Sequence, residues 1–172
     1  MNDLHARYQA ALQRYERPLI RYALGILPQL EDAQDVVQDT FLTLHRHLAT
    51  LDADRLAPWL FTVCKNRALD HRRKNHRLIP METATLELEA TPEPAPDVQL
   101  DQRETAATLR RLIDQLPDRQ REAVRLKFLA GLDYKQIAET MQTSIGNVGY
   151  LIHHGIATLR QHWEAQEITA TH

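Results

Sequence analysis

The segment 78–104 sets the strongest limit on how this chain can fold. It contains four prolines, no aromatic residue, and seven acidic side chains against one basic one, which gives it a net charge of −6. A segment of this composition buries too little apolar surface to offset the entropy lost on ordering it. The sequence therefore predicts two folded units, residues 1–77 and 105–172, joined by an acidic linker over 78–104. Such a linker limits the distance between the two units but leaves their relative orientation open.

The chain has the composition of an ordinary globular protein, since 43% of its 172 residues are hydrophobic and 26% are charged. No apolar run approaches the roughly 20 residues that span a bilayer, and the polar start MNDLHARYQ lacks the apolar core of a signal peptide. The single cysteine, Cys64, excludes an internal disulfide and any CxxC motif, and it is expected to be a small buried hydrophobe. We therefore expect a cytoplasmic protein without membrane insertion.

Apolar residues at three- and four-residue steps predict that the N-terminal unit is helical. A first helix covers residues 8–26, and Pro18 is expected to kink or break it. A second follows the PQLED turn, with Asp32 as its N-cap and an apolar stripe over 33–48. A third begins near residues 57–58, because proline is tolerated in a first helical turn.

The second and third predicted helices of the N-terminal unit each carry a polar face. On the second, Asp35, Gln38 and Asp39 are spaced i, i+3, i+4 and share one side, which by itself indicates a solvated face. On the third, residues 65–77 hold six Lys or Arg against one acidic side chain. Such a strip attracts phosphates, and the amide of Asn66 can bond a base edge. Nucleic acid is favoured over a membrane surface or a merely solvated face, because the opposite side carries a tryptophan suited to a hydrophobic core.

The C-terminal unit has the pattern of a helix-turn-helix. A helix over 105–116 is followed by one that Pro117 starts and Gly131 ends, and Asp133 with Gln136 forms a capping box that opens a short helix over 134–141. Ser144 caps the last helix after a tight turn. Its predicted core stripe consists of Ile145, Val148, Ile152, Ile156 and Leu159. Two helices joined by such a short connection are typical of a DNA-binding motif.

In this order the segments resemble an extracytoplasmic-function (ECF) sigma factor of the sigma-70 family. The segments EDAQDVVQDTFLTLHRHL, PWLFTVCKNRALDHRR and LPDRQREAVRLKFLAGLDYKQIAETM are similar to the core-binding, promoter-melting and promoter-reading regions of that family. The resemblance implies an all-helical fold, with sigma region 2 over 1–77 and sigma region 4 over 105–172. It implies a non-enzymatic initiation factor without a cofactor or metal, whose partners are core RNA polymerase, promoter DNA and an anti-sigma factor.

The resemblance also assigns roles to particular residues. The face formed by Asp35, Gln38 and Asp39 corresponds to the segment that docks on the polymerase clamp helices. The loop 49–55 corresponds to the family's pocket for a flipped base, and the acidic linker corresponds to the segment that runs along the polymerase's RNA path. The residues expected to contact the −10 element are Leu51, Lys65, Asn66, Arg72, Arg73 and Lys74.

The last helix departs from the family, whose members place lysine, arginine and serine along its outward face. Here that face carries Gly149, Tyr150, Leu151 and His154. We expect the helix to enter the major groove of the −35 element with weaker electrostatic anchoring, phosphate contacts shifting to Lys127, Lys135 and the backbone amides at the helix start. The rival interpretation is a protein-binding surface, because Tyr150 and Leu151 would add exposed apolar area. The residues expected to contact the −35 element are Lys135, Ser144, Gly146, Asn147, Tyr150, His153 and His154.

Two other functional classes fit the sequence less well. The alternative function is a helix-turn-helix transcriptional regulator that acts without joining the polymerase. Such a regulator needs a receiver or ligand domain, and the first 100 residues show no alternation of strand and helix patterns. A hydrolase or metalloenzyme is disfavoured because no GxSxG, Walker or HExxH motif occurs. His153 and His154 are adjacent and diverge by about 100° on a helix, so they are not expected to share a metal ion.

Overall fold

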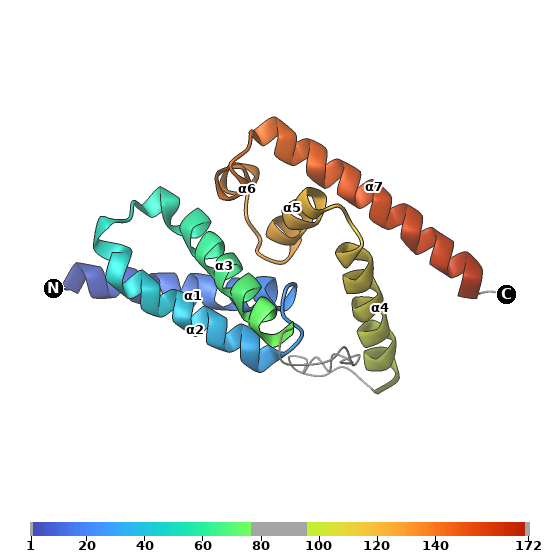
Figure 1. The fold of residues 1–172 in the computed structure, drawn as a ribbon, viewed down its shortest axis with the longest axis horizontal. Coiled ribbons are helices and arrows are strands. Elements are labelled where there is room, and N and C mark those ends of the chain that lie inside the picture. The colour runs from blue at the N-terminus through green and yellow to red at the C-terminus, as the bar shows by residue number, and fades with distance from the viewer. Residues whose placement is uncertain (1, 77–95, 171–172) are drawn as a thin grey trace.

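The structure, a computed structural model, describes residues 2–76 and 96–170, and within these ranges every regular element is a helix (Figure 1). The N-terminal unit consists of α1 (Asn2–Leu24), α2 (Leu30–His47) and α3 (Leu56–His76), with the short 3-10 helices Leu48–Thr50 and Ala53–Arg55 before α3. The C-terminal unit consists of α4 (Pro96–Asp114), α5 (Asp118–Phe128), α6 (Tyr134–Met141) and α7 (Ile145–Ala170). The predicted all-helical fold is confirmed. No helix in the described ranges is long and apolar enough to cross a membrane.

The acidic segment predicted as a linker over 78–104 lies mostly outside the described residues. Its last part is helical, because α4 begins at Pro96, earlier than the helix predicted over 105–116. Proline is well tolerated at the first helical position, where its missing N–H has no partner within the helix in any case. The division of the chain at 78–104 therefore stays a prediction.

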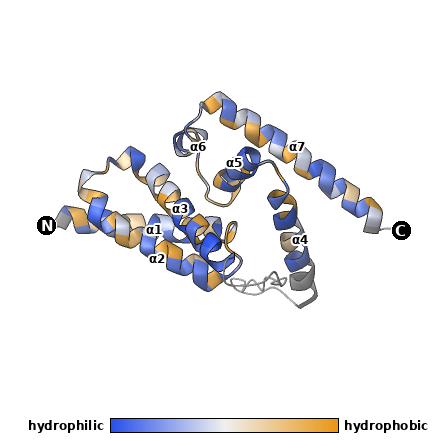
Figure 2. Cartoon of the chain, viewed as in Figure 1, coloured by the Kyte–Doolittle hydropathy of each residue, from blue (hydrophilic) through white to orange (hydrophobic). Residues whose placement is uncertain are grey.

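The apolar stripes of the N-terminal unit form a hydrophobic core in which α1, α2 and α3 pack against one another. Figure 2 shows apolar and polar residues interleaved along these helices. Tyr22 and Phe61 meet edge to face, with ring centroids 5.4 Å apart. Cys64 is completely buried, as predicted. Burial of a large apolar side chain contributes about 1.5–3 kcal/mol, so this packing fixes α3 and the strip it carries.

Pro18 does not break the first helix, so of the predicted kink or break, the break is wrong. α1 runs continuously from Asn2 to Leu24 with Pro18 inside it. A proline within a helix costs about 3 kcal/mol. Leu19 and Tyr22, in the turn that follows, are both completely buried, and their burial is large enough to offset that cost.

Asp32 is not the N-cap of α2, so that prediction is also wrong. The cap is Gln29, whose carbonyl accepts the hydrogen bond of the Ala33 N–H at 3.1 Å, and the helix begins at Leu30. Asp32 therefore lies inside the first turn. Its Oδ1 is 3.5 Å from Nε2 of His71 on α3, a pair that is ionic only when the histidine is protonated.

The helix-turn-helix of the C-terminal unit is confirmed. The Asp133 carboxylate accepts the Gln136 N–H at 2.8 Å, and the Gln136 side chain accepts the Asp133 N–H at 3.1 Å, which completes the predicted capping box. Gln142 has a left-handed backbone with φ of 53°, and this turns the chain between α6 and α7. The Ser144 hydroxyl accepts the Asn147 N–H at 3.1 Å, as expected of a cap.

The apolar stripe of α7 is rotated from the predicted one. Ile145 was expected in the core but is 53% exposed, and Leu151 was expected on the outward face but is buried together with Val148. The helix passes close to α5 at Gly155, where an added Cβ would lie 2.9 Å from Val124 Cγ2. This close approach sets the buried face at the i, i+3, i+4, i+7 positions that start at Val148, and Ile145 then falls outside it.

The two units pack against each other and share one hydrophobic core. Ala123, Leu126 and Ile137 of the C-terminal unit belong to the same cluster of buried residues as Leu19 and Phe61 of the N-terminal unit. α3 and α6 lie in contact, as can be followed in Figure 1. The relative orientation that the sequence left open is therefore a closed one, with side chains of both units buried between them.

Candidate functional site

The polar face predicted on α2 is exposed and borders a groove. Asp35 and Gln38 line this groove, which lies between α1 and α2 and is floored by apolar side chains that include Leu12, Phe41 and the exposed Leu42. An apolar floor with a carboxylate and an amide at its edge has the composition of a protein-binding surface, with a hydrophobic centre and a polar rim.

Asp39, the third residue of this face, differs from the other two because it has a partner on α3. Its Oδ2 lies 3.9 Å from Nη1 of Arg67, whose Nη2 donates to the Thr43 hydroxyl at 2.6 Å. Within the described part of the chain, neither Asp35 nor Gln38 forms an ion pair or a side-chain hydrogen bond. The structure thus leaves Asp35 and Gln38 free for a partner, while Asp39 is engaged in a weak surface ion pair.

The basic strip of α3 is divided into a free part and an engaged part. Arg73 makes only a surface ion pair, 3.6 Å from Asp70 on its own helix. Lys65 is engaged, because its Nζ lies 3.5 Å from Oε1 of Glu122 on α5. The residues of the strip that are exposed to solvent are Asn66, Arg72, Arg73 and Lys74.

The loop between α2 and α3 is held by the first helix. The Arg7 guanidinium donates to the Leu51 carbonyl at 2.9 Å, and the Leu51 side chain is half-buried against the hydrophobic core. The Thr50 hydroxyl donates to the His47 carbonyl at 3.0 Å. Asn66, the other residue expected at a base pocket, lies roughly three turns further along α3. The loop is therefore fixed in place, and Leu51 offers part of its side chain to solvent.

The expected DNA-reading face of α7 is exposed and carries rings in place of cations. The rings of Tyr150 and His154 are in contact at a tilt of 44°, with centroids 4.0 Å apart, and the His153 ring lies edge-on to that of His154 at 5.6 Å. Nothing would meet a Cβ added at Gly146, so the helix start is open to close approach. The exposed members of the expected set are Lys135, Ser144, Gly146, Tyr150, His153 and His154.

Two residues expected to contact DNA are engaged within the C-terminal unit. The Asn147 amide donates to the Thr143 hydroxyl at 2.9 Å, and its side chain is half-buried. Lys127 Nζ lies 5.3 Å from the ring centroid of Tyr134, in a cation–π contact. A base or phosphate must compete with these local contacts, which are worth about 0.5–1.5 kcal/mol each.

Sequence reasoning missed a polar contact at the centre of the closed arrangement. The Tyr22 hydroxyl donates to Oε1 of Glu122 at 2.5 Å, and both residues are buried. Burial raises the pKa of Tyr22 well above its ordinary value, and the adjacent Glu122 carboxylate raises it further. The only sequence signal was a glutamate beside apolar positions of the α5 pattern, which is equally typical of a solvated helix face.

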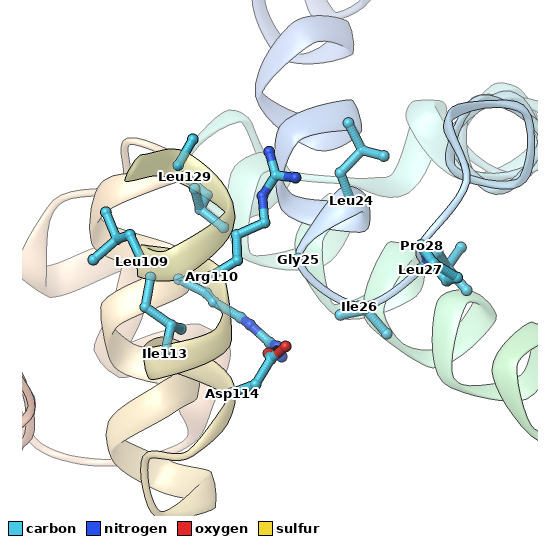
Figure 3. A pocket seen from close by; sticks show the side chains of 12 residues that line it. Leu24, Gly25, Ile26, Leu27, Pro28, Leu109, Arg110, Ile113, Asp114 and Leu129 are labelled. Carbon is cyan, nitrogen blue, oxygen red and sulfur yellow. Dashed lines mark hydrogen bonds and ion pairs between the residues drawn. The ribbon is translucent and has the colours of Figure 1, made fainter. Parts of the chain in front are cut away.

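A cavity of about 280 Å³ lies at one end of the contact between the units (Figure 3). The turn after α1 forms one wall and the helices α4 and α5 form the other. Arg125 donates to the Asp114 carboxylate at 2.6 Å, and burial lowers its pKa while that carboxylate acts in the opposite direction. Burial lowers the pKa of Arg110 in the same way. In Figure 3 the Arg110 side chain extends across the cavity toward Leu24.

Comparisons with known proteins match both units separately. The family described as Sigma-70 region 2 matches residues 11–78, and that described as Sigma-70, region 4 matches residues 106–159. The ECF RNA polymerase sigma factor SigL of Mycobacterium tuberculosis is 31% identical over 169 residues, which cover 90% of each chain. The ferric citrate uptake sigma factor FecI of Escherichia coli is 37% identical over 123 residues, 68% of each chain. The solved structure of CnrH in complex with the cytosolic domain of CnrY is similar with a TM-score of 0.67 and 22% identity, covering 94% of this chain and 90% of that one.

Proposed function

The chain belongs to the ECF group of the sigma-70 family, the RNA polymerase sigma factors, and on this premise we propose which of its surfaces performs each step of initiation. A sigma factor binds core RNA polymerase and directs transcription initiation at promoters. The observation that supports this function most strongly is the presence of both sigma regions, in order, on one chain. A helix-turn-helix regulator acting outside the polymerase is not favoured, because the N-terminal unit is itself a sigma region.

The first step is docking on core RNA polymerase, which we assign to α2. Asp35 and Gln38 lie at the edge of the apolar groove between α1 and α2, and neither has a polar partner among the described residues. Charged groups at the rim of an interface steer association and select the partner, while the apolar floor supplies buried area. Asp39 extends the face and forms a weak surface ion pair with Arg67 of α3.

The second step is contact with the −10 element, which we assign to α3 and the loop before it. Asn66, Arg72, Arg73 and Lys74 present an amide and three cations to solvent. Cations bind the phosphate backbone without regard to sequence, whereas an amide can bond a base edge. A flipped base would meet the half-buried Leu51, which the Arg7 hydrogen bond holds in position. Phosphate binding by a basic helix is thus combined with one apolar contact for a base.

The third step is contact with the −35 element, which we assign to the start of α7. Gly146 permits close approach, and Tyr150 and His154 offer groups that bond phosphates or base acceptors. Lys135 and the amides beside Ser144 supply the electrostatic anchor. For the rival interpretation, a protein-binding surface, the buried Leu151 contributes no exposed apolar area, whereas Ile145 and Tyr150 are exposed.

Further partners follow from family membership. Similarity also extends to a solved structure of the sigma factor RpoE in complex with the anti-sigma factor NepR from Bartonella quintana, with a TM-score of 0.67 and 20% identity. We assign an anti-sigma factor as a second protein partner of this chain, and the cytoplasm, where RNA polymerase acts, as its place of action. The chain itself catalyses no reaction in this proposal; the polymerase does.

The experiment that tests the proposed function is run-off transcription with purified core RNA polymerase and fragments of the source genome. The expected result is a set of transcripts with defined start sites that form only when the chain is added. Promoter specificity is then read from the aligned start sites. Core polymerase that neither binds the chain nor gains any start site would contradict the proposal.

A further inference from the structure

Three helices from both units meet at one carboxylate. Glu122 lies on α5, and its Oε1 accepts the hydroxyl of Tyr22 on α1 at 2.5 Å. The same oxygen lies 3.5 Å from Nζ of Lys65 on α3. Tyr22 is completely buried and Glu122 is only 8% exposed, so this contact forms in a desolvated place.

Glu122 depends on the N-terminal unit for its partners. Among the described residues, its hydrogen bond to Tyr22 and its ion pair with Lys65 come from that unit, and the buried Arg125 of its own helix adds an electrostatic attraction. A buried carboxylate is costly unless it is paired and hydrogen-bonded, and its desolvation offsets much of what the pair contributes. The contact therefore specifies one arrangement of the units without making that arrangement as stable as an apolar core. Such an arrangement is suited to opening.

The contact between the two units is packed unevenly near Gly25 and Arg125. At Gly25 the chain passes close to α5, since an added Cβ would lie 3.0 Å from Leu129 Cδ1 and 3.3 Å from Arg125 Nε. Beside this tight point lies the cavity of about 280 Å³. The Nε of Arg125 is buried there without a hydrogen-bond partner in the described residues. A cavity and an unsatisfied polar atom both lower the stability of a buried contact, so this end of the contact is less stable than the hydrophobic core that the two units share.

Lys65 belongs to the strip that we assign to the −10 element. The Glu122 carboxylate oxygen lies beside the Lys65 ammonium group, where a phosphate oxygen would lie in a complex with DNA. Three further cations of the strip, Arg72, Arg73 and Lys74, are exposed. Closure therefore pairs Lys65, whose side chain is still 36% exposed, and leaves the other end of the strip available.

From these contacts we propose that this sigma factor closes on itself through Glu122, whose carboxylate takes the place of a DNA phosphate on Lys65 until the two units separate. The free chain then exists mainly in a form that cannot place both units on a promoter. Core RNA polymerase, by binding the open form, shifts the population toward it. The closure goes beyond the proposed function; only the masking of Lys65 rests on its assigned contact with DNA.

The test of closure measures the distance between spin labels on the two units of the full chain. Ala49→Cys and Gln161→Cys place one exposed label on each unit, and Cys64 is completely buried and stays unlabelled. In this background Lys65→Glu sets two carboxylates against each other, and Tyr22→Phe removes the hydroxyl while keeping the ring. Asp118→Asn is the matched control, because that carboxylate is also on α5 but pairs with Arg121 of its own unit.

We expect a single, narrow distribution of separations, that of the closed form, in the unmodified background and in Asp118→Asn. Lys65→Glu is expected to raise the ratio of open to closed chains by roughly tenfold or more, and Tyr22→Phe by about tenfold at most. Adding Glu122→Lys to Lys65→Glu restores opposite charges and should restore the distribution of the closed form. The proposal would be overturned if Lys65→Glu kept the closed-form distribution, or if the double exchange were as open as Lys65→Glu alone. Circular dichroism confirms that each variant remains helical.

The masking of Lys65 is tested with single-stranded −10 DNA and the full-length Glu122→Gln variant, which keeps Lys65 itself. A chain with the neutral amide should bind this DNA more tightly than the unmodified chain, and Asp118→Asn should bind it as the unmodified chain does. If Glu122→Gln opened the chain in the distance measurement but bound DNA no more tightly, the phosphate-like role of the carboxylate would be refuted. The distance measurement itself needs neither polymerase nor DNA, so failure of closure and failure of the proposed function are distinguishable.

Discussion

Asp39 of α2 lies 3.9 Å from Arg67 of α3, whereas Asp35, one helical turn earlier on the same face, has no partner among the described residues. The two carboxylates share a face but respond differently to substitution. Asp39→Lys would set a cation against Arg67, whose Nε is already buried without a hydrogen bond. Asp35→Lys disturbs no internal contact and is the cleaner probe of the polymerase-docking face.

We predict that Asp35→Lys weakens binding to core RNA polymerase by roughly tenfold, because it reverses the charge at the rim of the proposed interface. Fluorescence anisotropy of the labelled chain against core polymerase measures this affinity. Asp3→Lys, the same exchange at an exposed position of α1, is the control and should bind normally. Equal affinities of the two variants would remove Asp35 from the interface.

For the basic strip, we predict that Arg72→Ala and Arg73→Ala each flatten the salt dependence of binding to single-stranded −10 DNA. Removing one phosphate-binding cation reduces the slope of log affinity against log salt by about 0.7. Arg160→Ala removes an exposed cation from the far part of α7 and serves as the control. The double variant should also slow promoter opening. Normal melting of the −10 region in permanganate footprinting of that variant would show that the strip is only a solvated face.

The buried thiol of Cys64 and the buried hydroxyl of Tyr22 make the stability of the chain depend on pH. Burial raises the pKa of the Cys64 thiol from 9.0 to about 12 and raises the pKa of Tyr22 above 10.0. Both groups are neutral in the folded chain, so their contribution to stability is fully present below about pH 9. It is lost as the pH rises through 9 to 12, because the unfolded chain releases these protons first. Urea denaturation at pH 7, 9 and 10.5 should show a falling free energy of unfolding above pH 9. A constant value would contradict the burial of both groups.

Two glycines of α7 are predicted to respond in opposite directions to alanine. An added Cβ at Gly155 would lie 2.9 Å from Val124 Cγ2, a stiff and buried side chain, so Gly155→Ala should destabilise the chain by about 1 kcal/mol even after the gain in helix propensity. At Gly149 the nearest atom would be 3.7 Å away, and Gly149→Ala should stabilise by up to about 1 kcal/mol. Thermal unfolding compares the two. Stabilisation by both substitutions would show that α5 and α7 are not in close contact at Gly155.

The local capping of α6 was predictable from the sequence, whereas the N-cap of α2 and features set by distant partners were not. The capping box of Asp133 and Gln136 needs only residues three apart, and the sequence predicted it correctly. The buried face of α7 depends on where α5 touches it, so Ile145 and Leu151 were placed wrongly. The hydrogen bond from Tyr22 to Glu122 joins residues 100 positions apart and has no local signature.

The same division holds for the candidate site. The spacing of Asp35 and Gln38 on a polar face was enough to predict that both are exposed. Whether an exposed group is free to bind depends on other helices, and the sequence could not show that Asp39 meets Arg67 or that Lys65 meets Glu122. The roles of these residues in binding polymerase and DNA stay predictions.

The face of α7 that carries Tyr150 and His154 is predicted to contact the −35 element through bonds to bases, with little help from charge. Asn147 must exchange its hydrogen bond to the Thr143 hydroxyl for one to a base, and Tyr150, whose ring lies against that of His154, is exposed on the same helix. Removing a paired hydrogen bond to a base costs about 1–3 kcal/mol, so Asn147→Ala should lower transcription roughly tenfold on the preferred −35 sequence and much less on others. Tyr150→Ala should do the same in weaker form, and Gln161→Ala, exposed further along the helix, should have no effect. Transcription from promoters with systematically varied −35 bases measures this preference. If output is indifferent to those bases in the unmodified chain as well as in the variants, α7 does not read the −35 element and the exposed rings are free to bind a protein partner instead.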